Sequence, residues 1–212
     1  MTNKSAKERQ NPYLNALASF THQDLSSKRP SFSDSTDSLI FLYRLRNGFL
    51  TFENELLVRP LDSSSVGVSA WNHPDGWKSE YGGLVSSLTF FAENIFGEQY
   101  GVTSDGEFAK FWPETGAIDT VASDVEGWAK WLYSDYQVET GYPFAVWFQN
   151  EHGPLRLGQR LAPIVPFSFG GNYEVSNLYA ATDDAAMRTR ASIAKQIENL
   201  PEGAPVTIRI TE

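Results

Sequence analysis

Short apolar segments alternate with turn residues over positions 88–122, and this pattern constrains the fold more than any other feature of the sequence. Ser104-Asp105-Gly106 and Pro113-Glu114-Thr115-Gly116 are typical of the tight turns that join antiparallel strands. Phe96-Gly97 breaks the apolar run that precedes them. The pattern predicts an antiparallel meander of four strands, at residues 88–95, 98–103, 107–112 and 117–122.

A helix is predicted directly after this meander. Ser123-Asp124-Val125-Glu126 has the form of a capping box, in which Ser123 and Glu126 satisfy backbone amides at the start of a helix. Apolar residues then recur at helical spacing and share one face, namely Val125, Trp128, Ala129 and Leu132.

Further helices and strands are predicted on both sides of the meander. Helices are expected over residues 12–20, 37–46, 143–151 and 182–200, and strands over residues 49–52, 56–61, 173–180 and 206–210. Residues 62–83 are interpreted as a long, partly irregular connection. This order predicts a single α+β domain, with a mainly antiparallel, twisted sheet flanked by helices and a C-terminal strand–helix–strand extension.

Composition excludes several classes of function. The 212 residues include no cysteine and only three histidines, His22, His73 and His152. Disulfides, thiol nucleophiles and thiolate metal sites are therefore excluded, and no two histidines have a metal-binding spacing. No apolar run approaches the roughly 18 residues that span a bilayer, and the charged N-terminus lacks the apolar core of a secretory signal. We expect a cytoplasmic protein without a metal or cofactor.

The charge is unevenly distributed along the chain. Residues 1–30 have a net charge of +3, whereas residues 31–212 have a net charge of −12. Residues 93–151 alone contain eleven acidic residues against two basic ones, a net charge of −9. Such a negative field repels nucleic acid and attracts basic partners, although solubilising charge is an equally good explanation at this stage.

Residues that could act in catalysis all have simpler structural interpretations. His73 could pair with Asp75 or Glu80 as base and orienting group, but His-Pro-Asp-Gly is an ordinary turn composition. Ser69 lies in a sequence that lacks the last glycine of a nucleophile elbow. The acidic pairs Asp105/Glu107 and Asp183/Asp184 are expected at a hairpin turn and a helix start. A small carboxylate-dependent hydrolase remains an alternative.

Several of these segments together resemble the SUKH superfamily. The resemblance begins with the helix leading into Tyr43-Arg44-Leu45-Arg46-Asn47-Gly48-Phe49, followed by Leu56-Leu57-Val58-Arg59-Pro60-Leu61. It continues through Phe90-Phe91-Ala92-Glu93-Asn94-Ile95-Phe96-Gly97 and Gln99-Tyr100-Gly101, and then through residues 108–112, Gly116 and the helix from Ser123. On this basis residues 36–135 are the SUKH-like core, residues 1–35 a polar arm and loop, and residues 136–212 an extension packed on the core.

The resemblance implies a binding function without catalysis. SUKH proteins are mostly bacterial immunity proteins that bind cognate toxins in the cytoplasm, and many of these toxins are nucleases or nucleic-acid deaminases with basic surfaces. Fungal and other relatives act as regulatory interaction scaffolds, which is the main alternative. An acidic middle region agrees with capture of a basic toxin, with no nucleic-acid or membrane partner. The oligomeric state is left open.

The partner is expected at the acidic junction between the last hairpin and the predicted helix. Partly exposed aromatic residues among carboxylates suit the capture of a basic protein surface. The predicted contact residues are Trp112, as an anchor, with Glu114, Asp119, Asp124 and Glu126. The aromatic residues Trp77 and Tyr81 of the long connection form a second candidate.

Overall fold

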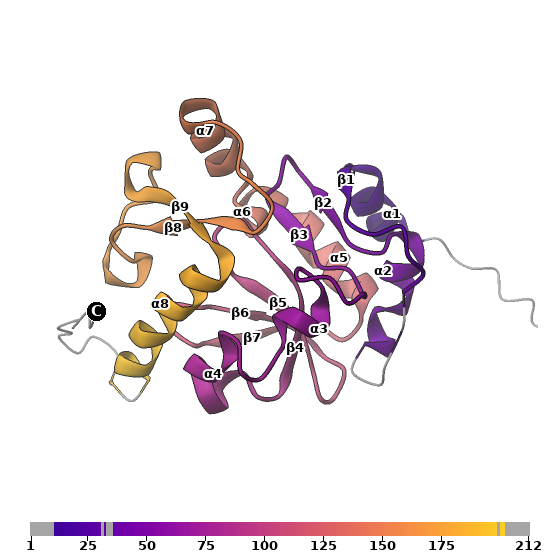
Figure 1. Ribbon diagram of the computed structural model, residues 1–212, viewed down its shortest axis with the longest axis horizontal. Helices are drawn as coiled ribbons and strands as arrows, with labels where there is room; N and C mark the ends of the chain where they lie inside the picture. Colours follow the sequence, from indigo (N-terminus) through magenta and orange to yellow (C-terminus); the bar gives the residue numbers. More distant parts are fainter. Residues whose placement is uncertain (1–10, 31, 33–35, 199, 202–212) are drawn as a thin grey trace, which may run out of the picture.

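A seven-stranded antiparallel sheet forms the centre of the computed structural model, which describes residues 11–30, 32, 36–198 and 200–201 (Figure 1). The strands lie in chain order, so each pairs with the next, and the bounds are β1 Thr21–Asp24, β2 Phe49–Thr51, β3 Leu56–Val58, β4 Leu88–Glu93, β5 Gln99–Thr103, β6 Phe108–Phe111 and β7 Ile118–Ala122. The predicted meander is confirmed as β4–β7, with its ends within two residues of the expected positions. By contrast, β1 lies in a segment that was expected to be a loop.

Helices cover both faces of this sheet. Phe90 and Phe91 are neighbours on β4, and they point into two separate hydrophobic clusters because successive strand residues face opposite sides. The cluster around Phe91 is covered by α1 (Pro12–Ser19), α2 (Ile40–Leu45) and α5 (Val125–Ser134). The cluster around Phe90 is covered by α3 (Val68–Trp71), α4 (Lys78–Tyr81) and α8 (Asp183–Ile197). Figure 1 shows α4 and α8 on the near side of the strands and α5, drawn fainter, beyond them.

The start of α5 differs from the predicted capping box. Asp124, not Ser123, is the N-cap residue, and its Oδ1 accepts a hydrogen bond of 2.7 Å from the backbone amide of Gly127. The first helical residue is Val125, so the N-cap position directly before it is occupied by Asp124. An N-cap side chain accepts from the amide of the third helical residue, which here is Gly127. Glu126 falls in the first turn, where an acidic side chain is stabilised by the helix dipole.

Gly48 is needed for the turn after α2. It has a φ of +77°, and a Cβ atom at this position would lie 2.6 Å from backbone and side-chain atoms of Pro60. Asn47 fixes the same turn, because its Oδ1 accepts from the amide of Leu61 at 2.7 Å and its Nδ2 donates to the carbonyl of Lys28 at 2.9 Å. The Asn-Gly pair thus joins α2, β2 and the end of β3.

The connection of residues 62–83 is more regular than predicted. It contains the single-turn helices α3 and α4 and begins a 3-10 helix, η2 (Gly82–Val85), while another, η1 (Asp37–Leu39), precedes α2. Trp77 and Tyr81 anchor the connection on the sheet, since each side chain is only 1% exposed. Their burial explains why this segment carries so many large aromatic residues.

Residues 136–182 pack against the end of the sheet, in the upper left part of Figure 1. This segment contains α6 (Tyr136–Thr140), α7 (Tyr142–His152), a second sheet of β8 (Gln159–Pro163) and β9 (Leu178–Thr182), and the 3-10 helices η3 (Phe167–Phe169) and η4 (Val175–Asn177). A third hydrophobic cluster joins Ile95 and Phe96 to α7 and to both strands. The predicted strand at residues 206–210 lies outside the described residues.

A buried ionic network also connects this extension to the sheet. Glu93 of β4 lies 3.0 Å from Arg59 Nη2 and 2.8 Å from Arg160 Nε, and Arg59 Nη2 lies 2.9 Å from Asp183 at the start of α8. Burial opposes ionisation of Glu93, but the two guanidinium groups outweigh it and lower the pKa of this carboxyl. Asp183 was expected only to stabilise the start of α8. Its ion pair with Arg59 also links α8 to the end of β3. The molecule is a single α+β domain, as predicted.

The turn between β2 and β3 is strained. Three consecutive non-glycine residues, Phe52, Glu53 and Asn54, have φ values of +51°, +54° and +81°. Such conformations cost roughly 1–3 kcal/mol each unless the surroundings enforce them. Gln149 of α7 holds the turn, because its Nε2 donates to the carbonyl of Glu53 at 3.0 Å. Glu55, which follows the turn, is fully buried.

Candidate functional site

Trp112 lies at the centre of a group of charged side chains at the end of β6. Its indole Nε1 donates a hydrogen bond of 2.7 Å to Asp119 of β7, and the ammonium group of Lys110 lies 3.9 Å from the centre of its ring. The backbone amide of Trp112 donates to the carbonyl of Ala117 at 2.9 Å, which closes the turn. Trp112 is half-buried, so these contacts fix an aromatic side chain that still reaches the surface.

Lys110 adds no net positive charge to this region. Its Nζ lies 2.8 Å from Glu98 and 2.9 Å from Glu139. Burial disfavours the charged form of Lys110, but the two carboxylates outweigh burial and raise its pKa. One base is thus shared by two acids, and this ion cluster has a net charge of −1.

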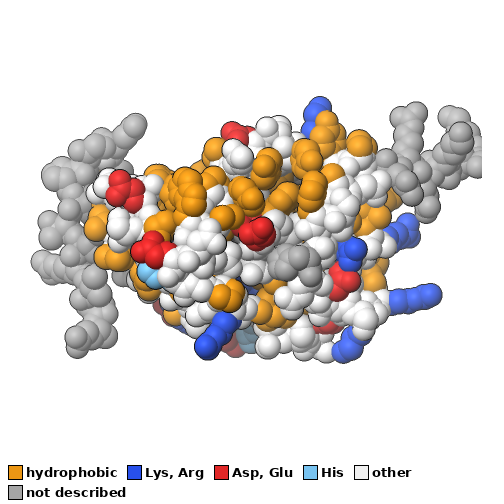
Figure 2. Space-filling view, turned by 90° about the horizontal axis from the view of Figure 1, so that it is seen from above, with side chains coloured by type: hydrophobic (Ala, Val, Ile, Leu, Met, Phe, Trp, Pro, Cys, Tyr) orange, Lys and Arg blue, Asp and Glu red, His pale blue; other side chains and the backbone are white. Residues whose placement is uncertain are grey.

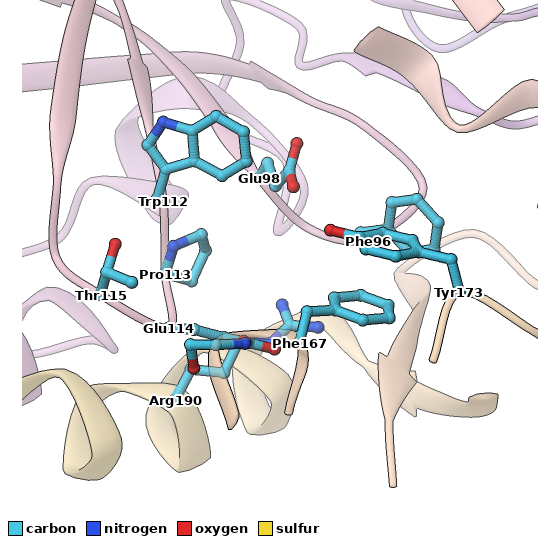
Figure 3. A pocket seen from close by; sticks show the side chains of 10 residues that line it. Phe96, Glu98, Trp112, Pro113, Glu114, Thr115, Phe167, Tyr173 and Arg190 are labelled. Atoms are coloured by element: carbon cyan, nitrogen blue, oxygen red, sulfur yellow. The ribbon is translucent and has the colours of Figure 1, made fainter. Parts of the chain in front are cut away.

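A cavity of about 250 Å³ opens beside Trp112 (Figure 3). Its walls come from four separate segments: the β4–β5 turn, the β6–β7 turn, the loop between β8 and β9, and α8. The backbone amide of Ser168 donates to Glu114 at 2.8 Å and thereby holds the β8–β9 loop against the β6–β7 turn. The rings of Phe167 and Tyr173 stack with centroids 4.0 Å apart and form one aromatic wall.

The polar groups around the cavity are two carboxylates, a phenol and a guanidinium. Glu98 and Glu114 line it, and burial together with these two charges raises the pKa of Tyr173, which keeps its hydroxyl protonated. Arg190 reaches the cavity from α8 (Figure 3). With the two acids and Arg190, the lining has a net charge of −1.

The structure brings three of the predicted contact residues together. Trp112 and Glu114 line the cavity, and Asp119 is bonded to Trp112. Asp124 and Glu126 lie at the far end of β7, separated from this group by the length of the strand. Asp124 is exposed but serves as the cap of α5.

The second candidate, Trp77 and Tyr81, is wrong. Both side chains are buried between α4 and the sheet, and the Tyr81 hydroxyl donates to the carbonyl of Pro113 at 2.9 Å. Tyr81 therefore stabilises the β6–β7 turn from the interior of the protein and is not accessible to a partner. Aromatic content alone did not distinguish a buried residue from an exposed one.

Sequence reasoning missed the other walls of the cavity, namely Phe96, Glu98, Phe167, Tyr173 and Arg190. These residues are up to 94 positions apart in the chain, from Phe96 to Arg190, and only the folded extension brings them together. Glu98 was counted among the eleven acids of residues 93–151, but the charge pattern alone did not distinguish it from the others. No local motif marked the other wall residues.

A second surface feature is a row of aromatic rings on another side of the molecule. Phe20 stacks on Phe52 of the strained turn at 5.7 Å, Phe52 stacks on Tyr136 at 5.4 Å, and Tyr133 lies between Phe20 and Tyr136. Phe20 is 52% exposed. Figure 2, which shows the molecule from above, shows hydrophobic side chains gathered on its upper face with a few acidic ones among them. Exposed Glu53 follows Phe52 and exposed Asp135 precedes Tyr136, so acidic side chains border this row as well.

The geometry does not assemble the catalytic groups considered from the sequence. His73 Nδ1 lies 3.9 Å from Asp75, and both side chains are largely exposed. Ser69 and His73 line the same open depression, but no hydrogen bond joins their side chains within the described ranges. No three His, Asp or Glu side chains among the described residues are placed to hold a metal ion. In the same part of the chain, no helix is long and apolar enough to cross a membrane.

The fold and site define an α+β protein with a seven-stranded antiparallel meander, helices on both faces and an acidic, aromatic-lined cavity at one end. The structure of Atu4351 from Agrobacterium tumefaciens is similar, with a TM-score of 0.52 and 14% sequence identity over 84% of this chain and 88% of that chain. This similarity concerns the fold alone. The sequence matches no protein-family model, and no curated protein matches it.

Proposed function

We propose that the chain is an immunity protein of the SUKH type, which binds a cognate toxin and neutralises it by protein–protein interaction in the cytoplasm. The sequence resemblance supports this proposal, because its motifs fall on α2, the Asn47-Gly48 turn, β3 to β6 and α5. The observation that carries the proposal is Trp112, a half-exposed aromatic residue fixed by Asp119 and Lys110 beside an acidic cavity. Fixed aromatic residues among charges are typical binding hot spots.

Neutralisation would follow from occlusion. A nuclease or nucleic-acid deaminase needs a basic surface to hold its substrate, and an acidic protein docked there excludes the nucleic acid. Long-range attraction also speeds the encounter, which favours capture before the toxin acts. No residue of this chain is required to perform chemistry. Neither the regulatory scaffold nor the small hydrolase is favoured by a specific feature of the site.

The experiment compares two double variants with equal charge changes. Glu114→Lys with Asp119→Lys reverses the charge beside Trp112, whereas Asp105→Lys with Glu107→Lys reverses the same number of charges at the β5–β6 turn. The partner is the toxin expressed from the gene next to that of this chain. Association is followed by stopped-flow fluorescence at several salt concentrations.

We expect the first variant to slow association by about tenfold and to weaken its salt dependence, and the second to slow it by about twofold. Equal effects of the two variants would show that only overall charge matters and would move the contact surface away from Trp112. A neighbouring gene product that is not toxic, or that does not bind, would contradict the proposed function.

A further inference from the structure

Arg190 carries a buried donor without a partner in the cavity beside Trp112. The residue is 6% exposed, and its Nη2 donates to the carbonyl of Leu161 at 3.3 Å. Its Nη1 has no hydrogen-bond partner among the described residues. Gly97 leaves room for this nitrogen, because a Cβ atom there would lie 3.0 Å from it. This nitrogen has less than 1 Å² of exposed surface and packs against Gly97, so Arg190 brings a positive charge to the cavity wall rather than a donor that a ligand can reach.

The rest of the lining suits a cation. Glu98 and Glu114 place two carboxylates at the cavity, and the stacked rings of Phe167 and Tyr173 offer an aromatic wall. Lys110 and Glu139 adjoin Glu98 and cancel each other in charge, so Glu98, Glu114 and Arg190 leave the site with a net charge of −1. A ligand with one positive charge makes the occupied site neutral, whereas an anion would leave it at −2. Aromatic faces and carboxylates together are the usual surroundings of a bound guanidinium or ammonium group.

We propose that the cavity receives an arginine residue of the partner protein, and this inference rests on the proposed function. In the proposed complex the guanidinium lies between the carboxylates of Glu98 and Glu114 and against the aromatic wall. A planar guanidinium stacks on rings and can donate to two carboxylates at once, which a lysine ammonium cannot do equally well. The volume of about 250 Å³ suits one side chain, because sites for larger ligands are typically bigger.

The probe is N-acetyl-L-arginine amide, which carries the guanidinium on a main chain with both ends capped. Its binding is followed through the indole N–H signal of Trp112 in ¹⁵N–¹H spectra, which the Trp112→Phe variant assigns. N-acetyl-L-citrulline amide is the matched control, since it has the same shape without the charge. N-acetyl-L-glutamate tests the anion alternative at Arg190.

We expect a saturable shift with the arginine probe, at least tenfold weaker binding of the citrulline probe and no response to the glutamate probe. Glu114→Gln keeps an acceptor for the Ser168 amide and should weaken the arginine probe by about tenfold. Asp105→Asn, which removes an exposed acid at the β5–β6 turn, should leave binding unchanged. An unshifted Trp112 signal, equal binding of arginine and citrulline, or preferential binding of glutamate would overturn the inference.

The same probe separates this inference from the proposed function. A toxin that binds equally well in the presence of saturating N-acetyl-L-arginine amide leaves the proposed function intact and excludes the cavity as its anchor site. A chain that binds the probe at Trp112 but protects against no toxin retains the arginine site and loses the immunity function.

Discussion

Glu55 offers a test of the folded structure that depends on pH. Its side chain is fully buried after the strained β2–β3 turn, and neither carboxylate oxygen has a hydrogen-bond partner among the described residues. Burial, aided by the nearby charge of Glu53, raises the pKa of Glu55 from 4.5 to about 9. The folded protein therefore keeps a proton on Glu55 at neutral pH that the unfolded chain has released.

This difference fixes both the sign and the size of the effect. Between pH 4.5 and 9 the folded state holds one more proton than the unfolded state, so raising the pH destabilises the fold by about 1.4 kcal/mol per unit. At pH 7 the accumulated penalty is about 3 kcal/mol. Glu55→Gln replaces the carboxylic acid by a neutral group of similar shape. The variant should be about 3 kcal/mol more stable than the wild type at pH 7, and nearly equal to it at pH 4.5.

Urea unfolding followed by tryptophan fluorescence at pH 4.5, 5.5, 7 and 8.5 measures this difference. Glu53→Gln is the comparison, since it removes an exposed charge that contributes only a minor part of the raised pKa of Glu55, and it should stabilise the fold by much less than Glu55→Gln does. A stability difference for Glu55→Gln that does not grow with pH, or a variant less stable than the wild type at pH 7, would refute the reasoning.

Three further predictions concern stability, each measured by urea unfolding at pH 7. Trp128→Ala should destabilise the fold by about 3–5 kcal/mol, because the ring is fully buried against the sheet. Lys130→Ala, on the exposed side of α5, should be nearly neutral. Equal costs would mean that the buried and exposed faces of α5 are assigned wrongly. Asp124→Ala should cost about 1 kcal/mol and Ser123→Ala close to nothing, and the reverse order would restore Ser123 as the cap. Glu93→Gln should cost about 3–5 kcal/mol, because it leaves two buried guanidinium groups without their shared carboxylate; a neutral result would show that the network is not closed in solution.

Local signals predicted the elements of the core well. The turn residues around Gly106 and Gly116 predicted the β5–β6 and β6–β7 hairpins. The helix expected over residues 37–46 is found as η1 and α2, and its apolar residues Leu39, Leu42 and Tyr43 are buried. These features depend on near neighbours in the chain. β1 was missed because Thr21–Asp24 is short and polar, and it becomes a strand only by pairing with β2.

The candidate site was predicted only in part, for a different physical reason. Trp112, Glu114 and Asp119 are close in sequence and were found from charge and aromatic content. Arg190 and Tyr173 reach the same cavity through the packing of α8 and the β8–β9 loop, which no pattern in the sequence reports. Trp77 was assigned to the surface because its sequence context resembles a loop, whereas tertiary packing buries it.

Hydrogen–deuterium exchange of this chain, alone and mixed with the product of the neighbouring gene as the proposed toxin, tests the central claim most directly. We predict slower exchange on binding at residues 112–119 and 167–173, around Trp112 and the cavity. Exchange at the aromatic surface of Phe20, Phe52, Tyr133 and Tyr136 should be unchanged. Protection confined to that aromatic surface, with residues 112–119 exchanging as in the free protein, would contradict it.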